Sequence, residues 1–447
     1  DGCSYTFRLR KNVKFSNGSP LTSSDVLYTF KRLLTYPKSC NQDIVMEIKG
    51  AAKLMNGATD QLEGFKIIND REFVITLEQP FAAFLACITL PAASIMDEET
   101  TEAVGDQFGM DPESTVGTGP FIFEEWNPGR GMKLRANPDC WQGAPDLDGL
   151  DLRFLNEAEE QRQMFENGDL DFLDLDELGD LAEYFIKGSI YKDKLYKMQQ
   201  IGISYIALNG SIEPLDDVRV RKAMQLSLDR RAILNAVYSG RGSLENGIFP
   251  HGLIGYNPDL PEIPYDPVMA KKLLAEAGYP DGFDMDVATR NSSTQLDMER
   301  MKLAASMWKE IGINANLKII DESEFMDLRK AGKLACYTAT WIADYNDPDN
   351  FIFTFFGNDA NTVNRSICYS DEAVMERVRK ARGIVDESAR IKEYQDLEKI
   401  IIQDDAAWIP LLSRLRYYVV GDRIENFHGA WNGSVKNVYR YMKFKNE

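Results

Sequence analysis

The chain contains 447 residues, of which 44% are hydrophobic and 27% are charged, a composition that is ordinary for a globular protein and excludes collagen and intrinsic disorder. Its 51 basic and 70 acidic residues give a formal net charge of -19, so nucleic-acid phosphates and anionic lipid surfaces would be repelled. We therefore expect two or three domains of about 150 residues each and no nucleic-acid partner.

Membrane spans and metal chemistry are both disfavoured by the sequence. The most apolar stretch, residues 81–93, contains Thr89 and Pro91 and is shorter than the roughly 18 residues that a membrane helix needs. Only two histidines are present, and the six cysteines include no C-x-x-C pair, so the usual zinc sites cannot be built. We expect no metal, no cofactor and buried cysteine thiols.

The N-terminal third alternates strand patterns with a helix pattern. Residues 5–15 alternate apolar and polar side chains, which predicts a strand, and a turn follows at residues 16–20. The sequence T-S-S-D at residues 22–25 resembles a capping box and predicts the start of a helix. Further strands are predicted at residues 72–77, 121–123 and 133–135.

The remaining chain mixes helices and strands, which predicts an α/β fold. The pair Asp216-Asp217 is expected to cap one helix whose apolar positions run from Val218 to Val237. Asp266 and Pro267 form an N-cap and first-turn pair, and the helix they begin should stop at Gly278. Other helices are predicted at residues 298–310, 371–385 and 390–403, and strands at residues 315–320, 408–412 and 417–420.

Seven sequence blocks, in order along nearly the whole chain, resemble the large extracytoplasmic solute-binding proteins of peptide-importing ABC transporters. Each block alone is mostly turn and cap chemistry, but their ordered co-occurrence is difficult to obtain by accident. The blocks are YTFRLR (5–10), FSNGSPLTSSDV (15–26), GTGPF (117–121), NPDCW (137–141), EPLDDVRVRKA (213–223), LLAEAGYPDGF (273–283) and WIADYNDP (341–348).

The resemblance implies a two-lobed periplasmic-binding-protein clamshell with an additional β-rich subdomain, the lobes being joined by two crossing strands. By analogy the β-rich subdomain covers residues 1–97, the first lobe residues 98–203 and 417–447, and the second lobe residues 204–416. Members of the family begin with an export signal and an initial strand upstream of residue 5. We therefore expect this chain to lack an N-terminal segment.

The resemblance also implies a function. Such a protein is an extracytoplasmic receptor that captures short peptides between its lobes and delivers them to the permease subunits of an ABC importer. It would be a monomer without enzymatic activity, attached to the membrane only through a lipid anchor that this chain does not contain. The alternative is the same scaffold binding a different solute: a metal chelate, an opine or a sugar.

The two ends of a peptide require opposite charges in the binding site. A buried ammonium group must be paired, because an unpaired desolvated charge costs several kcal/mol. In peptide-binding relatives a Trp-x-x-Asp motif supplies the carboxylate, and here Trp341 and Asp344 have that spacing. A simple turn before Pro348 is the alternative role for Asp344. The resemblance suggests Arg290 for the peptide carboxylate, with Arg329 as the rival.

Pockets that accept many side chains should be lined by aromatic residues, although packing in the core is an equally good explanation of each aromatic residue. The aromatic residues placed in the site by motif position are Trp341, Tyr345, Tyr205 and Tyr417. Peptide backbone pairing would fall to residues 205–209, which end at Asn209, and to residues 339–340. Some dipeptide receptors have a disulfide in the region of Cys368, but the second cysteine has no counterpart here.

Overall fold

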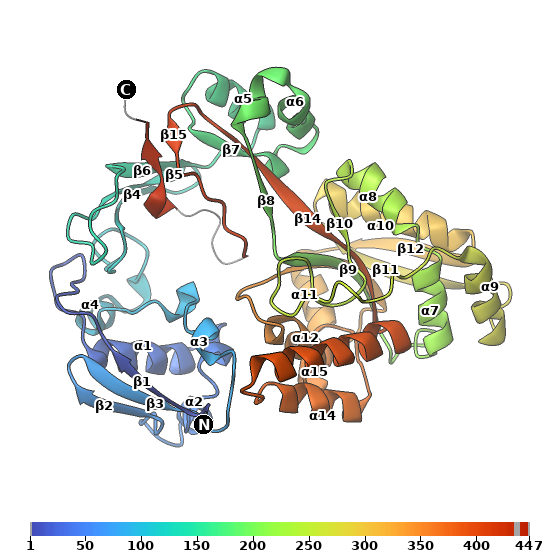
Figure 1. Cartoon of the computed structure of the whole chain (residues 1–447), viewed down its shortest axis with the longest axis horizontal. Coiled ribbons are helices and arrows are strands. Elements are labelled where there is room, and N and C mark those ends of the chain that lie inside the picture. Colours follow the sequence, from blue (N-terminus) through green and yellow to red (C-terminus); the bar gives the residue numbers. More distant parts are fainter. Residues whose placement is uncertain (1, 433–438, 446–447) are drawn as a thin grey trace. The chain divides into compact units, whose positions relative to one another are not determined.

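The computed structural model describes residues 2–432 and 439–445, and these form two compact units. Unit 1 contains residues 2–197, 416–430 and 439–445, and unit 2 contains residues 198–415, 431 and 432. Two strands, Leu195–Gln199 (β8) and Trp408–Val420 (β14), hold residues of both units (Figure 1).

The N-terminal part of unit 1 is built on an antiparallel sheet with the strand order β1-β3-β2. Its strands are Ser4–Arg8 (β1), Phe65–Asn69 (β2) and Glu72–Thr76 (β3). The strand predicted over residues 5–15 is therefore shorter than expected. It ends because Arg8 pairs with Glu72, the first residue of β3, and the following segment folds into the turn in which Phe15 N donates to Ser19 O.

The predicted capping box is present at the start of helix Ser23–Thr35 (α1), where the backbone N of Thr22 donates to the Asp25 carboxylate over 2.8 Å. A second antiparallel sheet of unit 1 has the order β4-β5-β6. Its strands are Phe121–Asn127 (β4), Gly131–Ala136 (β5) and Gly149–Arg153 (β6). The other elements of unit 1 are Ala51–Met55 (α2), Phe84–Cys87 (α3), Glu98–Val104 (α4), Ala158–Glu166 (α5), Phe172–Asp174 (β7), Ala182–Lys187 (α6), Ile424–Glu425 (β15) and Lys443–Phe444 (β16).

Unit 2 is organised around a sheet with the strand path β10-β14-β9-β13-β11-β12. The pairs of β11 with β12 and with β13 are parallel, and the others along this path are antiparallel. The strands other than β14 are Gly202–Leu208 (β9), Gly242–Leu244 (β10), Phe283–Arg290 (β11), Ile313–Ile320 (β12) and Cys336–Ile342 (β13).

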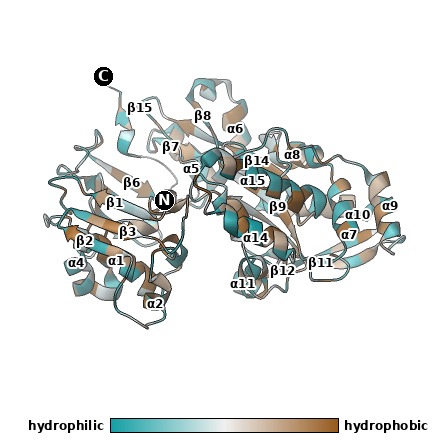
Figure 2. Cartoon of the chain, turned by 60° about the horizontal axis from the view of Figure 1, so that its bottom comes forward, coloured by the Kyte–Doolittle hydropathy of each residue, from teal (hydrophilic) through white to brown (hydrophobic). Residues whose placement is uncertain are grey.

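Hydrophobic cores cover both faces of this sheet. Tyr205 and Ala207 of β9 belong to one core, and Ile206 and Leu208 belong to the other, as the period of two in a strand requires. Helices on both sides of the sheet carry hydrophilic and hydrophobic residues together, as expected of helices with one buried side (Figures 1 and 2). The helices of unit 2 are Val218–Leu226 (α7), Arg230–Tyr238 (α8), Pro267–Glu276 (α9), Gln295–Lys309 (α10), Glu322–Lys330 (α11), Asp349–Phe356 (α12), Asp359–Asn364 (α13), Glu372–Ala381 (α14) and Glu387–Lys399 (α15).

Two element predictions are corrected by the structure. The single helix expected up to Val237 is two helices, because Asp229 accepts a hydrogen bond from Ala232 N over 2.8 Å and caps α8 as a new start. The two strands expected at residues 408–412 and 417–420 form one strand, β14. The strand continues through the polar residues between the two apolar runs. One of them, Arg416, pairs with the Asp174 carboxylate of β7.

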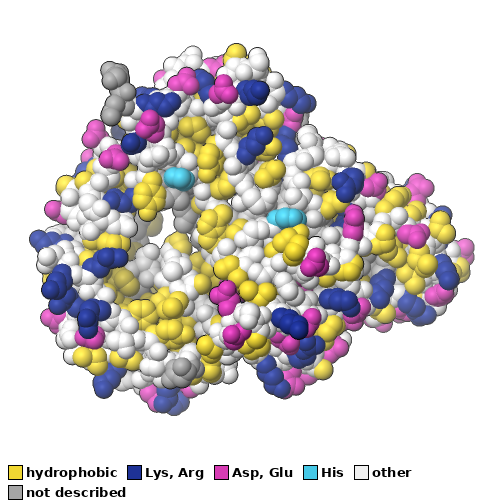
Figure 3. Space-filling view, in the orientation of Figure 1, with side chains coloured by type: hydrophobic (Ala, Val, Ile, Leu, Met, Phe, Trp, Pro, Cys, Tyr) yellow, Lys and Arg dark blue, Asp and Glu magenta, His cyan; other side chains and the backbone are white. Residues whose placement is uncertain are grey.

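The cysteines and the surface can be compared with the sequence expectations. All six cysteines are free thiols; Cys87, Cys140 and Cys336 are buried as expected, whereas Cys40 is exposed. Acidic and basic side chains are interspersed on the face shown in Figure 3. Within residues 2–432 and 439–445, no helix is long and apolar enough to cross a membrane.

The buried carboxyl group of Glu398, on α15, joins this helix to the segment that contains Ile248 and Phe249. Both Ile248 N and Phe249 N donate to Oε1 of Glu398, over 2.6 and 2.7 Å, and a Cβ on Gly247 would come within 2.1 Å of the same oxygen. Burial, with a smaller contribution from the neighbouring Glu245 carboxylate, raises the pKa of Glu398 to about 8 against the lowering effect of the two backbone donors.

We expect this group to make the stability of the protein fall with rising pH. The folded protein keeps the Glu398 proton up to about pH 8, whereas the unfolded chain releases it near 4.5, so the free energy of unfolding should fall by about 1.4 kcal/mol per pH unit between those values. Urea unfolding of the wild type and of Glu398→Gln at pH 5.5 and 8.5 measures the difference. Equal pH dependence of the two proteins would contradict it.

Candidate functional site

The Trp-x-x-Asp motif lies where β13 ends and the chain turns towards α12. Asp344 is half-buried and follows the last residue of β13 by two positions. The Asn350 side chain accepts a hydrogen bond from Asp344 N over 2.9 Å and donates one to Asp344 Oδ2 over 3.2 Å. The carbonyl of Asn350 also accepts from Trp341 Nε1 over 3.0 Å. One residue of α12 therefore holds both ends of the motif in place.

Beneath this turn lie two buried ion pairs. Arg390 of α15 donates to both oxygens of Asp347, over 2.7 and 2.8 Å, and Arg382 donates to Asp349 over 2.9 Å. Burial raises the pKa of the Asp349 carboxyl above its ordinary value even though the Arg382 charge opposes this. The hydroxyl of Tyr345 also donates to Asp349, over 3.2 Å. The acidic run after Asp344 thus anchors the turn to α14 and α15, which the motif alone did not indicate.

Tyr205 and Asn209 are part of the packed interior of unit 2. The Tyr205 ring stacks on Trp408 with 4.3 Å between ring centroids, and its side chain is almost fully buried. Asn209 Nδ2 donates to the carbonyls of Gly332 and Leu334 over 2.9 and 3.0 Å. Both side chains therefore have structural partners, in agreement with the core interpretation that the sequence left open for Tyr205.

The prediction that a peptide backbone pairs with residues 205–209 is wrong. Strand β9 is hydrogen-bonded to β13 on one side and to β14 on the other, so it offers no free edge. Strand β13 is different, because its second edge pairs with β11 only at Cys336 and Tyr337. Among the described strands, none pairs with that edge at residues 338–342. The other segment predicted to pair with a peptide backbone, residues 339–340, therefore lies on an open edge of β13.

The two predicted arginines have different surroundings. Arg290, the last residue of β11, pairs with Glu322 over 3.2 Å, and its guanidinium lies 5.5 Å from the ring centroid of Phe325. Arg329 lies near the end of α11, and its Nε is buried without a hydrogen-bond partner among the described residues. Arg290 therefore has an anionic partner, whereas Arg329 has no ion-pair partner among the described residues.

A third arginine, Arg365, was not anticipated from the sequence. It follows α13, and its guanidinium lies 4.8 Å from the ring centroid of Trp341 and 5.2 Å from that of Phe355. Burial lowers the pKa of Arg365 and the positive charge of Arg329 adds to this, whereas the negative charge of Asp344 opposes it. The sequence around Arg365 contains no motif, so only its contact with Trp341 identifies it.

Tyr417 is the one predicted site residue in unit 1. It lies on β14, is buried, and its ring centroid is 5.4 Å from Nζ of Lys197. The other predicted residues, Asp344, Trp341, Tyr345, Arg290, Arg329, Tyr205 and Asn209, all belong to unit 2.

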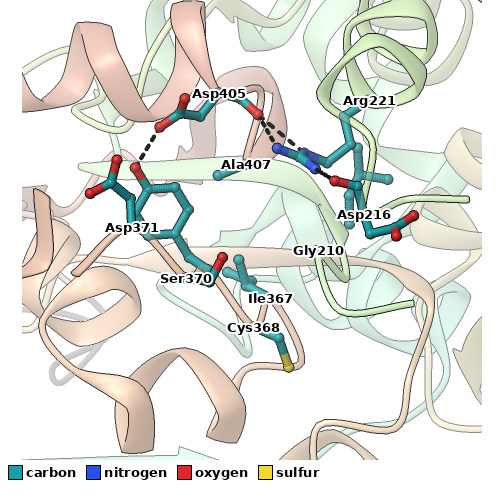
Figure 4. A pocket seen from close by; sticks show the side chains of 11 residues that line it. Gly210, Asp216, Arg221, Ile367, Cys368, Ser370, Asp371, Asp405 and Ala407 are labelled. Carbon is teal, nitrogen blue, oxygen red and sulfur yellow. Dashed lines mark hydrogen bonds between the residues drawn. The ribbon is translucent and has the colours of Figure 1, made fainter. Parts of the chain in front are cut away.

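A small cavity of unit 2, of about 150 Å³, is lined by none of the motif residues 341–348 (Figure 4). Arg221 lines it, but its guanidinium donates to the backbone carbonyls of Asp405, Leu215 and Asp216. The hydroxyl of Tyr369 donates to the Asp405 carboxylate. These groups satisfy one another, so they join helices rather than await a ligand. No group of three metal-ligating side chains occurs in residues 2–432 and 439–445.

The sequence and the fold can now be compared with known proteins. A profile of the bacterial extracellular solute-binding proteins, family 5 middle, matches residues 1–362. Heme-binding protein A of Haemophilus influenzae is 28% identical over 440 residues, which cover 96% of this chain and 79% of that protein. Di/tripeptide-binding protein 2 of Pseudomonas aeruginosa is 29% identical over 434 residues, which cover 93% and 79%.

The fold agrees with these matches. The structure of a periplasmic oligopeptide-binding protein of Borrelia burgdorferi superposes with a TM-score of 0.83 at 24% identity, covering all of this chain (100%) and 88% of that one. The predicted α/β class and the resemblance to peptide-transport receptors are thereby confirmed. Because the family profile spans most of its length, this chain belongs to family 5 of the bacterial extracellular solute-binding proteins.

Proposed function

We propose that the protein captures short peptides outside the cytoplasm and delivers them to the permease subunits of an ABC importer. It acts as a monomeric binding protein, not as an enzyme, and a lipid anchor attaches it to the membrane. The observation that carries the proposal is the half-buried Asp344 carboxylate, held by Asn350 at the end of a strand with an open edge. The name of the Pseudomonas aeruginosa relative supports the ligand class.

The chemistry of a free peptide suits this arrangement. The ammonium group of the peptide pairs with Asp344, and this pairing offsets the free-energy cost of removing the charge from water. The peptide backbone then adds to β13 along residues 338–342, on the edge opposite β9, where no described strand pairs with it. Trp341 and Tyr345 flank the carboxylate in sequence and line the space for the first side chains.

Calorimetric titration with free and N-acetylated di-, tri- and tetraalanine tests the function. We expect the free peptides to bind and acetylation to weaken binding at least tenfold, because it removes the charge that Asp344 pairs with. The same titration with a heme, an opine and a sugar tests the alternative ligand class, since a Haemophilus influenzae relative is a heme-binding protein. Binding of one of these in place of every peptide would refute the proposal.

A further inference from the structure

An exposed tryptophan, Trp431, belongs to unit 2 although most of the chain around it belongs to unit 1. It is 38% exposed, whereas Trp308 and Trp408, in the cores of unit 2, are completely buried. Within residues 2–432 and 439–445, the Trp431 indole has no hydrogen bond, ring contact or cation contact, although the exposed Trp141 has Arg10 at 4.7 Å from its ring centroid. The packing of the described residues therefore does not explain why an indole occupies this position.

Hydrogen bonds place the backbone of Trp431 beside the Trp-x-x-Asp motif. Ala343 N donates to Ile201 O over 2.8 Å, and Ile201 N donates to Trp431 O over 3.0 Å. The side-chain amide of Asn432, the next residue, donates to the carbonyl of Asp344 over 3.4 Å. Residues 431 and 432 therefore run next to the segment that ends in Asp344, and all of these residues belong to unit 2.

The tryptophan of the motif itself already has partners. Trp341 Nε1 donates to the carbonyl of Asn350, and its ring packs edge-on against Phe355 with 5.4 Å between centroids. The guanidinium of Arg365 lies 4.8 Å from the centroid of the same ring. The Trp341 ring thus already contacts a cation of the protein. Trp431 is the second tryptophan next to Asp344, and no cation of the described residues lies over its ring.

An indole face suits an ammonium group. The π-system of an aromatic ring is negative on its face and attracts cations, most strongly for tryptophan and more strongly when the cation has lost water. A carboxylate contacts an ammonium group from one side only. A ring on another side stabilises the charge further without requiring a hydrogen bond.

We infer that the indole of Trp431 covers the ammonium group that Asp344 binds. The inference rests on the proposed function and refines it, because it adds a residue that selects for positive charge at the amino end of the ligand. Trp431 lies outside the sequence blocks that identify the family. Only the hydrogen bonds of residues 201, 431 and 432 bring it next to the motif.

Three ligands and three variants separate a cation contact from apolar packing. The ligands are trialanine, trialanine with a trimethylated amino end, which keeps its charge without N–H donors, and N-acetyltrialanine, which has no charge. W431F keeps an aromatic face, and W431L keeps only apolar bulk. W126L is the control, because Trp126 of β4 is similarly exposed, at 37%, and belongs to unit 1.

In calorimetric titrations we expect W431L to weaken binding of both cationic peptides at least tenfold and W431F less than fivefold, because only phenylalanine retains a π-face. Binding of N-acetyltrialanine should change less than twofold in both variants, and W126L should bind every ligand as the wild type does. Equal losses in W431F and W431L, an equal loss for the acetylated peptide, or unchanged binding of the cationic peptides by W431L would overturn the inference and leave the proposed function standing.

A wild type that binds none of the peptides would refute the proposed function, and a peptide-free measurement then decides the tryptophan site. NMR signals of isotopically labelled indole N–H groups are recorded, and the signal missing in W431F identifies Trp431. Tetramethylammonium chloride should shift this signal, whereas equal concentrations of sodium chloride or of uncharged tert-butanol should not. No shift with tetramethylammonium, or the same shift with tert-butanol, would overturn the inference.

Discussion

Replacing Asp344 by alanine is expected to weaken binding of a free-amine peptide by about 2 to 5 kcal/mol, the usual effect of removing one member of a buried charge pair. The turn itself should survive, because the backbone N of Asp344 is held by Asn350, whose carbonyl also receives Trp341 Nε1. Calorimetric titration of trialanine against the wild type and Asp344→Ala measures the loss. The free energy of unfolding should change far less than the affinity.

N-acetylated trialanine provides the matched control for this loss. It lacks the ammonium group, so its affinity should be nearly the same for the wild type and for Asp344→Ala. Asn350→Ala should give an intermediate loss for the free peptide, because it leaves the carboxylate in the chain but removes the side chain that orients it. Full affinity for the free peptide in a normally folded Asp344→Ala protein would show that another group holds the ammonium.

Replacing Asp347 by alanine is expected to lower the free energy of unfolding by about 3 to 5 kcal/mol. The Arg390 and Asp347 side chains are 7% and 8% exposed and make two hydrogen bonds, so the variant leaves a buried guanidinium without its carboxylate. Urea unfolding monitored by circular dichroism measures the change. Converting both partners, in Asp347→Ala with Arg390→Met, should recover part of the lost stability because no charge is then left unpaired.

The exposed pair of Lys380 and Glu376 on α14 is the control for that experiment. Its atoms are 2.7 Å apart, as close as those of the buried pair, but the two side chains are 73% and 54% exposed and stay hydrated. Glu376→Ala should therefore leave the unfolding curve unchanged. A similar change in Asp347→Ala and in Glu376→Ala would mean that burial does not determine the strength of the pair.

Local chemistry made several elements and the family predictable from the sequence. The helix starts at Thr22, Asp217 and Asp266 are where cap residues predicted them, because a cap satisfies backbone N–H groups within its own first turn. The second start, at Asp229, carries the same signal, but the apolar pattern continues past it and favours one longer helix. The ordered blocks identified the family because each reflects a turn or cap that the fold requires.

Partners that are distant in the sequence were decided only by the tertiary structure. Asp347 and Arg390 are 43 residues apart, and neither occupies a position whose spacing identifies the other. Arg365 reaches the site because α13 places it against Trp341, and β9 loses its free edge because β13 and β14 flank it. The periodicity of a segment reports which of its faces is buried, but not which charge, ring or strand covers that face, since this depends on how separate segments pack together.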